Sequence, residues 1–567
     1  MLIKKYYTSG TETEEGVIIM FLRGISKAFS NNFSKHIFHV IFTMLTICLI
    51  LVPKTLFSML NISHQSGFYV EAIQVTISSN VGGEIYYTLD GSLPKPGSLN
   101  TFIYTSPIFV QQSSDNKLMF IPTAPEWKAP QGQFKKATVL RVIEISQGHV
   151  TDEQVRTYFI GINHSLPIIS IIIEPENFFD TDKGIYVPGK LFDPSNPYWT
   201  GNYHQRGSEW ERPAIIEYFE NNQLKYRTDV GIRIHGEFSR SFPIKSLRLY
   251  ARNKEKEFTY PFFGRVGYKK LLLRNAGNDY EYAYMRDAVV QNIFKGLNFD
   301  TQDSYPVIHY INGEYWGIIY LMEYYDQRYL QLKHGVNEKN TVIINYDLTI
   351  QDGNEGDQAS FIELLEFVKT HDLAIKENYE KVCEMIDIDN FIDFKICEIL
   401  AANNDWPGNN ERMWRVLKKE NSLLGDGKWR WMMYDMDNSF WIPDHDTLKV
   451  ALHGDPDVPW TMKDEATLLL RKLMDNAEFR ARFIGRYTYI LENIFLPSRI
   501  SEIVEKQINL LKPEILQHCV RWGKPSFDEW LETSEWLKEF GIERSTFAVM
   551  LIKSLNHFGN SGQNQNK

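Results

Sequence analysis

Two short polar segments of this 567-residue chain carry the residue types that bind a hard metal ion. Asp435 and Asp437 follow residues 428–434, whose alternation of apolar side chains predicts a strand. Side chains alternate along a strand, so both carboxylates leave it on the same side. Asp405 and Asn410 supply a further carboxylate and an amide, and Mg²⁺ and Mn²⁺ prefer oxygen ligands of these types. The sequence therefore predicts that Asp435, Asp437 and Asn410 hold a divalent metal ion.

The loop that carries Asp405 is expected to be rigid because a buried helix leads into it. Asp389 is the expected N-cap of this helix. The apolar residues that follow recur at helical spacing: Ile392, Ile396, Ile399 and Leu400. The Pro-Gly pair at 407–408 ends the helix and forms the loop. Such a loop holds carboxylate and amide groups in a fixed, open position, with Asn409 as the alternative to Asn410 as a metal ligand.

The order of these segments is that of a phosphoryl-transfer site. Residues 412–417 and 428–434 predict two strands joined by a polar hairpin, which separates Asp405 from Asp435. In protein kinases a helix likewise leads to a catalytic loop with an Asp and, about five residues later, an Asn, and a strand hairpin then delivers a metal-binding Asp. Asp405 and Asn410 have that spacing. This order predicts that Asp405 is the catalytic base.

Four groups of residues support this interpretation through a family resemblance. They are residues 231–236 with 245–249, residues 273–275 with 285–287, residues 312–323, and residues 434–437. Together they make residues 165–550 similar to the CotH (spore-coat protein H) kinase family. The resemblance implies an extracytoplasmic, protein-kinase-like fold that phosphorylates proteins with ATP and a divalent metal.

The resemblance also implies roles in a small lobe that binds the nucleotide. Lys245 is expected on a strand at the place of a phosphate-binding lysine, and Asp287 or Glu281 is expected to pair with it. Glu323 would lie at the hinge near the adenine, and Arg233 would face phosphate or an acidic substrate. The residues expected to bind the cofactor are therefore Lys245, Glu323, Arg233 and Asp287.

The chain also departs from the ordinary protein-kinase pattern. It has no His-Arg-Asp triplet, no GxGxxG loop and no Asp-Phe-Gly, and a hairpin at residues 418–427 lengthens the interval from Asp405 to Asp435. A non-catalytic cell-surface binding or adhesion protein with a kinase-like fold is the alternative, and a metal-dependent hydrolase would need its ligands clustered differently. The retained base, metal ligands and Lys245 favour an atypical protein kinase that transfers phosphate from ATP to Ser or Thr of a surface or coat protein.

Residues 69–161 predict a small all-β sandwich ahead of the kinase-like domain. Residues 84–91 alternate as a strand should and close in an Asp-Gly turn. The stretch 85–94, with residues 104–108, resembles the C-terminal β-sandwich of chitobiases and β-hexosaminidases. That sandwich is an accessory module, so the resemblance implies no hexosaminidase activity. The module is expected either to contact a cell-wall glycan or to act as a spacer.

These segments predict a multidomain fold: a small all-β sandwich followed by an α+β atypical protein-kinase-like domain with a helical C-terminal region. The kinase-like domain is expected over residues 165–557, and residues 558–567 are expected to be a disordered tail. A net charge of −10 argues against general nucleic-acid binding, which needs a basic face. The four cysteines show no CxxC pair and no Cys/His metal spacing.

An apolar segment near the N-terminus predicts a membrane anchor. Residues 37–52 carry no Asp, Glu, Lys or Arg, and positively charged residues precede them. A helix over residues 37–60 is long enough to span a bilayer, and the positive-inside rule then leaves residues 1–36 in the cytoplasm. A cleaved signal peptide and a buried core helix are the alternatives. We therefore expect a membrane-anchored, extracytoplasmic protein at the cell surface.

Overall fold

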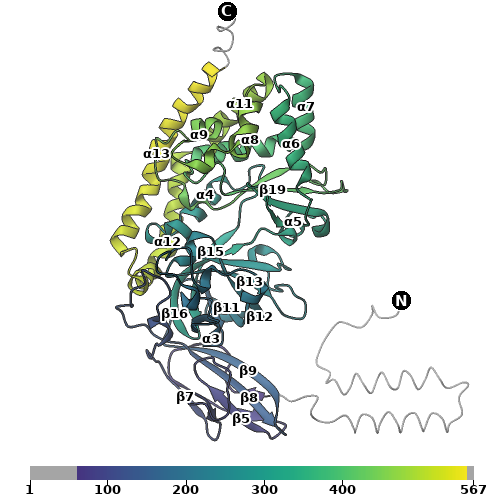
Figure 1. The fold of residues 1–567 in the computed structure, drawn as a ribbon. Coiled ribbons are helices and arrows are strands. Elements are labelled where there is room, and N and C mark those ends of the chain that lie inside the picture. Colours follow the sequence, from purple (N-terminus) through teal and green to yellow (C-terminus); the bar gives the residue numbers. More distant parts are fainter. Residues whose placement is uncertain (1–59, 559–567) are drawn as a thin grey trace, which may run out of the picture. The chain divides into compact units, whose positions relative to one another are not determined.

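Figure 1 shows the computed structural model of the chain, which describes residues 60–558. The chain divides into two compact units. The described part of the smaller unit is residues 60–61, Ile77–Ile85 and Ile143–Glu153. The larger unit holds Ile62–Thr76, Tyr86–Val142 and the described chain from Gln154 onward. The candidate site lies wholly within the larger unit.

The first part of the described chain is β-rich, as predicted. Its strands are β1 (Leu60–Ile62), β2 (Gly67–Tyr69), β3 (Ile73–Val75), β4 (Ile77–Ser79), β5 (Glu84–Thr88), β6 (Phe102–Ile103), β7 (Ile108–Val110), β8 (Thr138–Ser146) and β9 (His149–Ile160). In the larger unit, β3 pairs antiparallel with β7, and β5 with β6. Val139, Val155 and Ile172 form a small apolar core of their own.

A ring of strands forms the first sheet of the kinase-like region. Its strands are β10 (Ile168–Ile172), β11 (Arg212–Glu220), β12 (Gln223–His235), β13 (Ser246–Ala251), β14 (Lys270–Arg274), β15 (Ser304–Ile311) and β16 (Glu314–Glu323). The order is β11-β10-β15-β16-β14-β13-β12, and β12 pairs again with β11. Every residue of β10 and β16 is buried, because the ring covers one face and neighbouring elements cover the other. β14 therefore lies between β13 and β16, not at an edge.

A buried glutamate joins the β-rich part to this ring. Glu314, the first residue of β16, accepts hydrogen bonds from the backbone N–H groups of Lys117, Leu118 and Met119, at 2.7, 3.0 and 2.9 Å. In the turn between β15 and β16, the carbonyl of Gly313 accepts a hydrogen bond from the N–H of Ala137. The carboxylate thus fixes residues 117–119 against the kinase-like region.

A smaller sheet and a buried helix build the second half of the site. The sheet has the order β18-β17-β19-β20, from β17 (Thr341–Asn345), β18 (Ile350–Asp352), β19 (Glu411–Val416) and β20 (Arg430–Met433). The helix α8 (Ile388–Ala401) packs on β20. Its N-cap is Asp387, which accepts from the N–H of Asn390, so the expectation of Asp389 was wrong by two residues. The Asn390 side chain binds both backbone groups of Trp431 and locks α8 to the strand.

The C-terminal region is helical, and with it the predicted fold class is confirmed. Helices α9 (Thr447–His453), α10 (Asp464–Leu473), α11 (Ala477–Asn493), α12 (Pro497–Trp522) and α13 (Phe527–Phe558) follow one another (Figure 1). No helix within residues 60–558 is long and apolar enough to cross a membrane. The predicted segment 1–36, all but the last residue of the predicted anchor 37–60, and residues 559–567 lie outside the described residues.

Replacing Glu314 tests how firmly the β-rich part is fixed. Glu314→Ala leaves three buried backbone donors without an acceptor, so the free energy of unfolding should fall by about 3 kcal/mol. Urea denaturation of the purified protein measures this, with Glu355→Ala, at an exposed position, as the matched control. An unchanged midpoint for Glu314→Ala would show that residues 117–119 do not depend on this carboxylate.

Candidate active site

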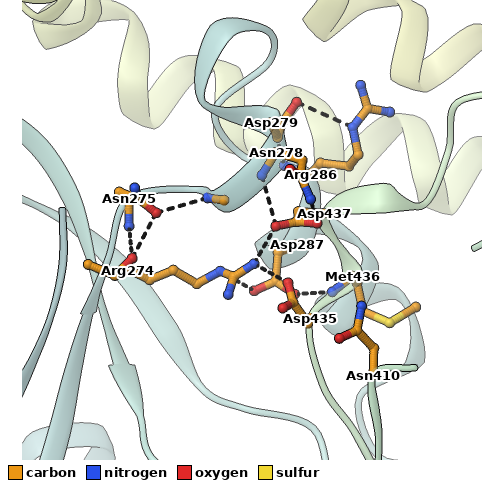
Figure 2. Close-up of polar contacts among 12 residues, drawn as sticks. Arg274, Asn275, Asn278, Asp279, Arg286, Asp287, Asn410, Asp435, Met436 and Asp437 are labelled. Atoms are coloured by element: carbon orange, nitrogen blue, oxygen red, sulfur yellow. Dashed lines mark hydrogen bonds and ion pairs between the residues drawn. The ribbon is translucent and has the colours of Figure 1, made fainter. Parts of the chain in front are cut away.

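The two aspartates predicted to bind metal meet on one arginine that the sequence analysis did not single out. Asp435 has a left-handed backbone with φ of 61°, and Asp437 lies in the turn η10 (Met436–Asn438). Arg274 is the last residue of β14, and its Nη2 lies 2.5 Å from Asp435 Oδ1 and 2.7 Å from Asp437 Oδ2 (Figure 2). The guanidinium therefore ties the first sheet to the loop that follows β20.

The turn that follows β14 also binds Asp437 through Asn278. Its carboxylate accepts from the backbone N–H of Asn278 at 3.0 Å and from the Asn278 amide at 3.2 Å. Gly277 precedes this contact with a φ of 58°, and a Cβ at its position would lie 1.7 Å from Asp437 Oδ2. A glycine is needed here, because any side chain would occupy the place of the carboxylate.

Arg274 also pairs with the helix that follows β14. Asp287 lies in the first turn of α4 (Arg286–Phe294), with Oδ2 3.6 Å from Arg274 Nε. Its Oδ1 accepts from the backbone N–H of Met436 at 2.8 Å. In protein kinases a lysine on the strand before this helix pairs with a helix carboxylate and must be in place for phosphoryl transfer. Arg274 and Asp287 form the same kind of link between strand and helix.

The pKa values of the three carboxylates around this guanidinium are shifted in different directions. Burial raises the pKa of Asp437 well above its ordinary value, and the negative charge of Asp435 adds to the rise. Burial alone would raise the pKa of Asp435 too, but the Arg274 charge and hydrogen bonds hold it below its ordinary value. Burial raises the pKa of Asp287 in spite of Arg274. One guanidinium does not neutralise all three groups, and a further cation bound beside Asp437 would oppose the rise in its pKa.

The excess of carboxylates over cations around Arg274 bears on whether a metal ion fits there. Among residues 60–558, no group of three or more His, Cys, Asp and Glu side chains is arranged as a ready metal cage. Mg²⁺ commonly uses only one or two protein carboxylates, and takes its other oxygens from phosphate and water. Asp435 and Asp437 provide such a pair, and their repulsion would be relieved by a divalent ion. The residues present therefore fit a metal that binds together with a phosphate.

Asp405 lies on the loop after α8, where two amides hold it. Asn409 Nδ2 donates to Asp405 Oδ1 at 2.9 Å, and Asn410 Nδ2 donates to Oδ2 at 2.8 Å. The Asp405 N–H donates to the side chain of Asn403, which in turn binds Glu398 of α8. Burial, together with the charge of Asp435, raises the pKa of Asp405. The structure thus brings Asp405 and Asn410 together and sets them near Asp435.

Two further arginines near the carboxylates form no ion pair with any residue of the described chain. Arg412 of β19 lies over the ring of Tyr434 at 3.5 Å, and its buried Nε and Nη1 have no hydrogen-bond partner in the described chain. Arg248 of β13 lies over the ring of Tyr324 at 4.4 Å, with its buried Nε also unpartnered. His235 sits 2.7 Å from Arg248, and burial with the nearby arginine charges lowers its pKa well below its ordinary value. These unpartnered guanidinium nitrogens beside a neutral imidazole make a candidate anion site.

The prediction for Lys245 has to be corrected. Its side chain is fully buried, and Nζ donates to the carbonyls of Thr123 and Phe242 at 2.7 and 2.6 Å. The ammonium also lies 3.9 Å from the centre of the Tyr203 ring. Burial lowers the pKa of Lys245 well below its ordinary value. The lysine therefore supports the loop before β13, and Arg274 stands at the carboxylates instead.

Glu323 is also turned away from the site, whereas Arg233 is close to it. The buried carboxylate of Glu323 accepts from the Tyr268 hydroxyl at 2.5 Å and from the N–H of Asp303 at 2.9 Å, so the expected contact with a nucleotide is not supported. Arg233 stands opposite Arg248 in the pairing of β12 with β13, but its charge is matched by Glu211 at 2.7 Å. A role for Arg233 stays a prediction.

The arginines missed by the sequence analysis lay inside stretches that carried the family resemblance. Arg248 belongs to 245–249 and Arg274 to 273–275. Arg412 begins the predicted strand 412–417. An arginine within a strand is usually a surface residue, and no spacing rule distinguishes these three. They are identified only by their buried environment in the folded chain. Arg274 lies among three carboxylates, whereas Arg248 and Arg412 form no ion pair within the described residues.

A strand ring, a helix linked to it by Arg274 and Asp287, and a loop with Asp405 define a protein-kinase-like protein. The chain belongs to the CotH kinase family, whose model, described as CotH kinase protein, matches residues 232–548, more than half of the chain. A second model, the chitobiase/beta-hexosaminidase C-terminal domain, matches residues 64–126. Both families and their order are as predicted. A comparison with curated proteins found no match.

The charge balance at Arg274 is open to a double-mutant test. Arg274→Met leaves buried carboxylates without their cation and should lower the free energy of unfolding by about 3 kcal/mol. Adding Asp437→Asn removes one of those carboxylates, so the double variant should be less destabilised than the sum of the single variants. Denaturant unfolding of all four proteins gives the coupling free energy. Strict additivity would contradict the shared charge cluster.

Proposed function

We propose that this protein is an atypical protein kinase that transfers phosphate from ATP to a Ser or Thr hydroxyl of a surface or coat protein. The observation that carries the proposal is the position of Arg274, which binds Asp287 of α4 and both aspartates after β20. A cation that links a strand, a helix and the metal-binding loop is the arrangement that protein kinases need for phosphoryl transfer. Membership of the CotH kinase family supports the same reaction.

The anion site offers a place for the phosphates of the nucleotide. Arg248 and Arg412 come from the two sheets and have no carboxylate partners in the described residues. Phosphate oxygens would satisfy their unpartnered nitrogens, and planar guanidinium groups suit phosphate geometry. Asp435 and Asp437, with Asn410, would hold Mg²⁺ or Mn²⁺, which when bound supplies charge neutralisation for the transferring phosphoryl group. Arg274 would keep the two carboxylates in position.

Asp405 is the proposed catalytic base. The acceptor oxygen forms a bond to the terminal phosphorus of ATP, the bond from that phosphorus to the bridging oxygen breaks, and ADP leaves with the electron pair. The proton of the hydroxyl passes to the Asp405 carboxylate. Burial and the amides of Asn409 and Asn410 fix this carboxylate in place. Its raised pKa makes it a stronger base than an exposed aspartate.

Measuring ATP binding and phosphate transfer separately tests the proposal. With Mg²⁺ or Mn²⁺, ATP should raise the melting temperature of the purified full chain. Asp435→Asn and Arg412→Met should both reduce this shift, because one removes charge from a metal ligand and the other removes a phosphate-binding cation. Arg471→Met, which changes a partly exposed arginine of α10, is the matched control and should keep the shift.

Asp405→Asn should keep the ATP-dependent shift and lower phosphate transfer to protein by about 10²–10⁴-fold, the range of general-base catalysis. Radiolabel transfer from ATP measures this. If the wild-type protein shows no shift with either metal, the phosphotransferase proposal fails and a non-catalytic surface-binding protein takes its place. Full transfer by Asp405→Asn would instead reject only the assignment of the base.

We further propose that the described residues lie outside the cytoplasm, held at the membrane by residues 37–60. The support is the sequence pattern of positive residues before an apolar segment. Protease added to intact cells should then degrade the kinase-like region. Complete protection of that region, with loss of an N-terminal tag instead, would reverse the orientation.

A further inference from the structure

A cavity of about 420 Å³ lies beside the turn η8 (Gly277–Glu281), and none of its lining residues belongs to the carboxylate cluster. Its volume is in the range of small-molecule sites. Residues 126–128 line one part of it, and the end of α12 with Gly523 and Lys524 lines another. Residue 126 is also the last one matched by the chitobiase/beta-hexosaminidase C-terminal model. The cavity is therefore built by the end of that module together with the CotH kinase region.

Three aromatic side chains line the cavity. They belong to Trp127, Tyr280 and Trp522. Tyr280 stacks on Phe242 with ring centres 4.3 Å apart, and the Trp522 indole N–H donates to the carbonyl of Trp316 at 2.9 Å. The rings of Tyr280 and Trp522 are thus held before any ligand arrives, which reduces the entropy lost on binding.

The charged groups of the lining cancel. Glu126 and Glu281 supply two carboxylates, and Lys128 and Lys524 supply two ammonium groups. Glu281 pairs with Lys524 at 3.0 Å. An anionic or a cationic ligand would meet as many repelling as attracting charges. The electrostatics favour a ligand without net charge that offers hydroxyl groups to these polar side chains.

A buried histidine adds a neutral donor. The Nδ1 of His518 accepts the N–H of Ile318 at 3.0 Å, so the hydrogen of the imidazole is on Nε2. Burial lowers the pKa of His518 to about 3, and the ring stays uncharged. Gly317 permits this approach, because a Cβ there would lie 2.7 Å from His518 Nδ1. His518 lines the cavity, so its neutral Nε2–H is the group that it can offer to a ligand.

An exposed aromatic strip continues from the cavity. Tyr198, Trp199 and Phe238 are 37, 52 and 38% exposed and pack on one another. The Tyr198 hydroxyl donates to Glu126, and Phe238 packs on Phe242 behind Tyr280. Exposed aromatic side chains that lie together mark a binding surface. The strip has room for a ligand longer than the cavity itself.

We propose that this cavity and strip bind a neutral oligosaccharide. The apolar C–H faces of sugar rings would pack on the three aromatic rings, and their hydroxyl groups would bind the charged rim and His518. This inference goes beyond the proposed phosphotransfer and does not depend on it. It also places the glycan contact where the chitobiase-like module meets the kinase region, and both regions supply lining residues.

Titration of the full chain with cellotetraose and N-acetylchitotetraose tests the proposal, read by tryptophan fluorescence and calorimetry. At least one of these neutral oligomers should bind saturably, and tetragalacturonate, which is anionic, should bind more weakly than either. Trp127→Ala should weaken binding by about tenfold or more, because it removes one stacking face. Trp460→Ala, at a 37% exposed tryptophan outside the cavity, is the matched control and should bind like the wild type.

Glu126→Gln, at an exposed position, should weaken binding severalfold, which keeps the test valid if Trp127→Ala fails to melt like the wild type. Asp405→Asn should bind the oligomers unchanged, so a failed phosphotransfer proposal and a failed glycan proposal give different results. The glycan proposal is overturned if no neutral oligomer binds, if tetragalacturonate binds most tightly, or if neither cavity variant has an effect.

Discussion

The ion-pair cluster at Arg274 is the interaction on which the rest of the site depends. Burial alone would lower the pKa of this guanidinium, but Asp435, Asp287 and Asp437 raise it well above its ordinary value. The contacts join β14, helix α4 and the loop after β20, which are far apart in the sequence. A buried guanidinium without these carboxylates would be costly, and so would the carboxylates without it. The elements are therefore held in one arrangement by charge as well as by apolar packing.

This cluster also explains how negative and positive charges are divided across the site. Arg274 is saturated with carboxylates, whereas Arg248 and Arg412 have none in the described residues. The first arrangement brings carboxylates together around one cation, and the second leaves guanidinium nitrogens without partners. His235 stays neutral between them because burial and the arginines lower its pKa. The carboxylates and the unmatched arginines thus occupy separate parts of the site.

The β-rich part makes direct contacts with the kinase-like region. Glu314 receives three backbone N–H groups from residues 117–119, and residues 126–128 help to line the cavity beside η8. β2 also pairs with both β12 and β9. These contacts all lie within the larger unit. The part of the matched chitobiase/beta-hexosaminidase C-terminal module that belongs to the larger unit, residues 64–76 and 86–126, therefore packs with the kinase region, and this offers a physical basis for a joint binding site.

The sequence by itself determined the parts of the site that depend on local spacing. Asp435 and Asp437 were identified because they follow a predicted strand two residues apart, although the left-handed Asp435 and the turn η10 bring both to Arg274. Asn410 binds Asp405 because one short loop carries both. The family resemblance and the order of the modules were also evident from the residues. Only the tertiary structure decided which basic residue faces the carboxylates. Lys245 directly precedes β13 and Arg274 ends β14, but β14 ends next to α4, whereas the Lys245 side chain binds two carbonyls and lies over the Tyr203 ring. Strand order and burial make that choice, and neither is encoded in local spacing.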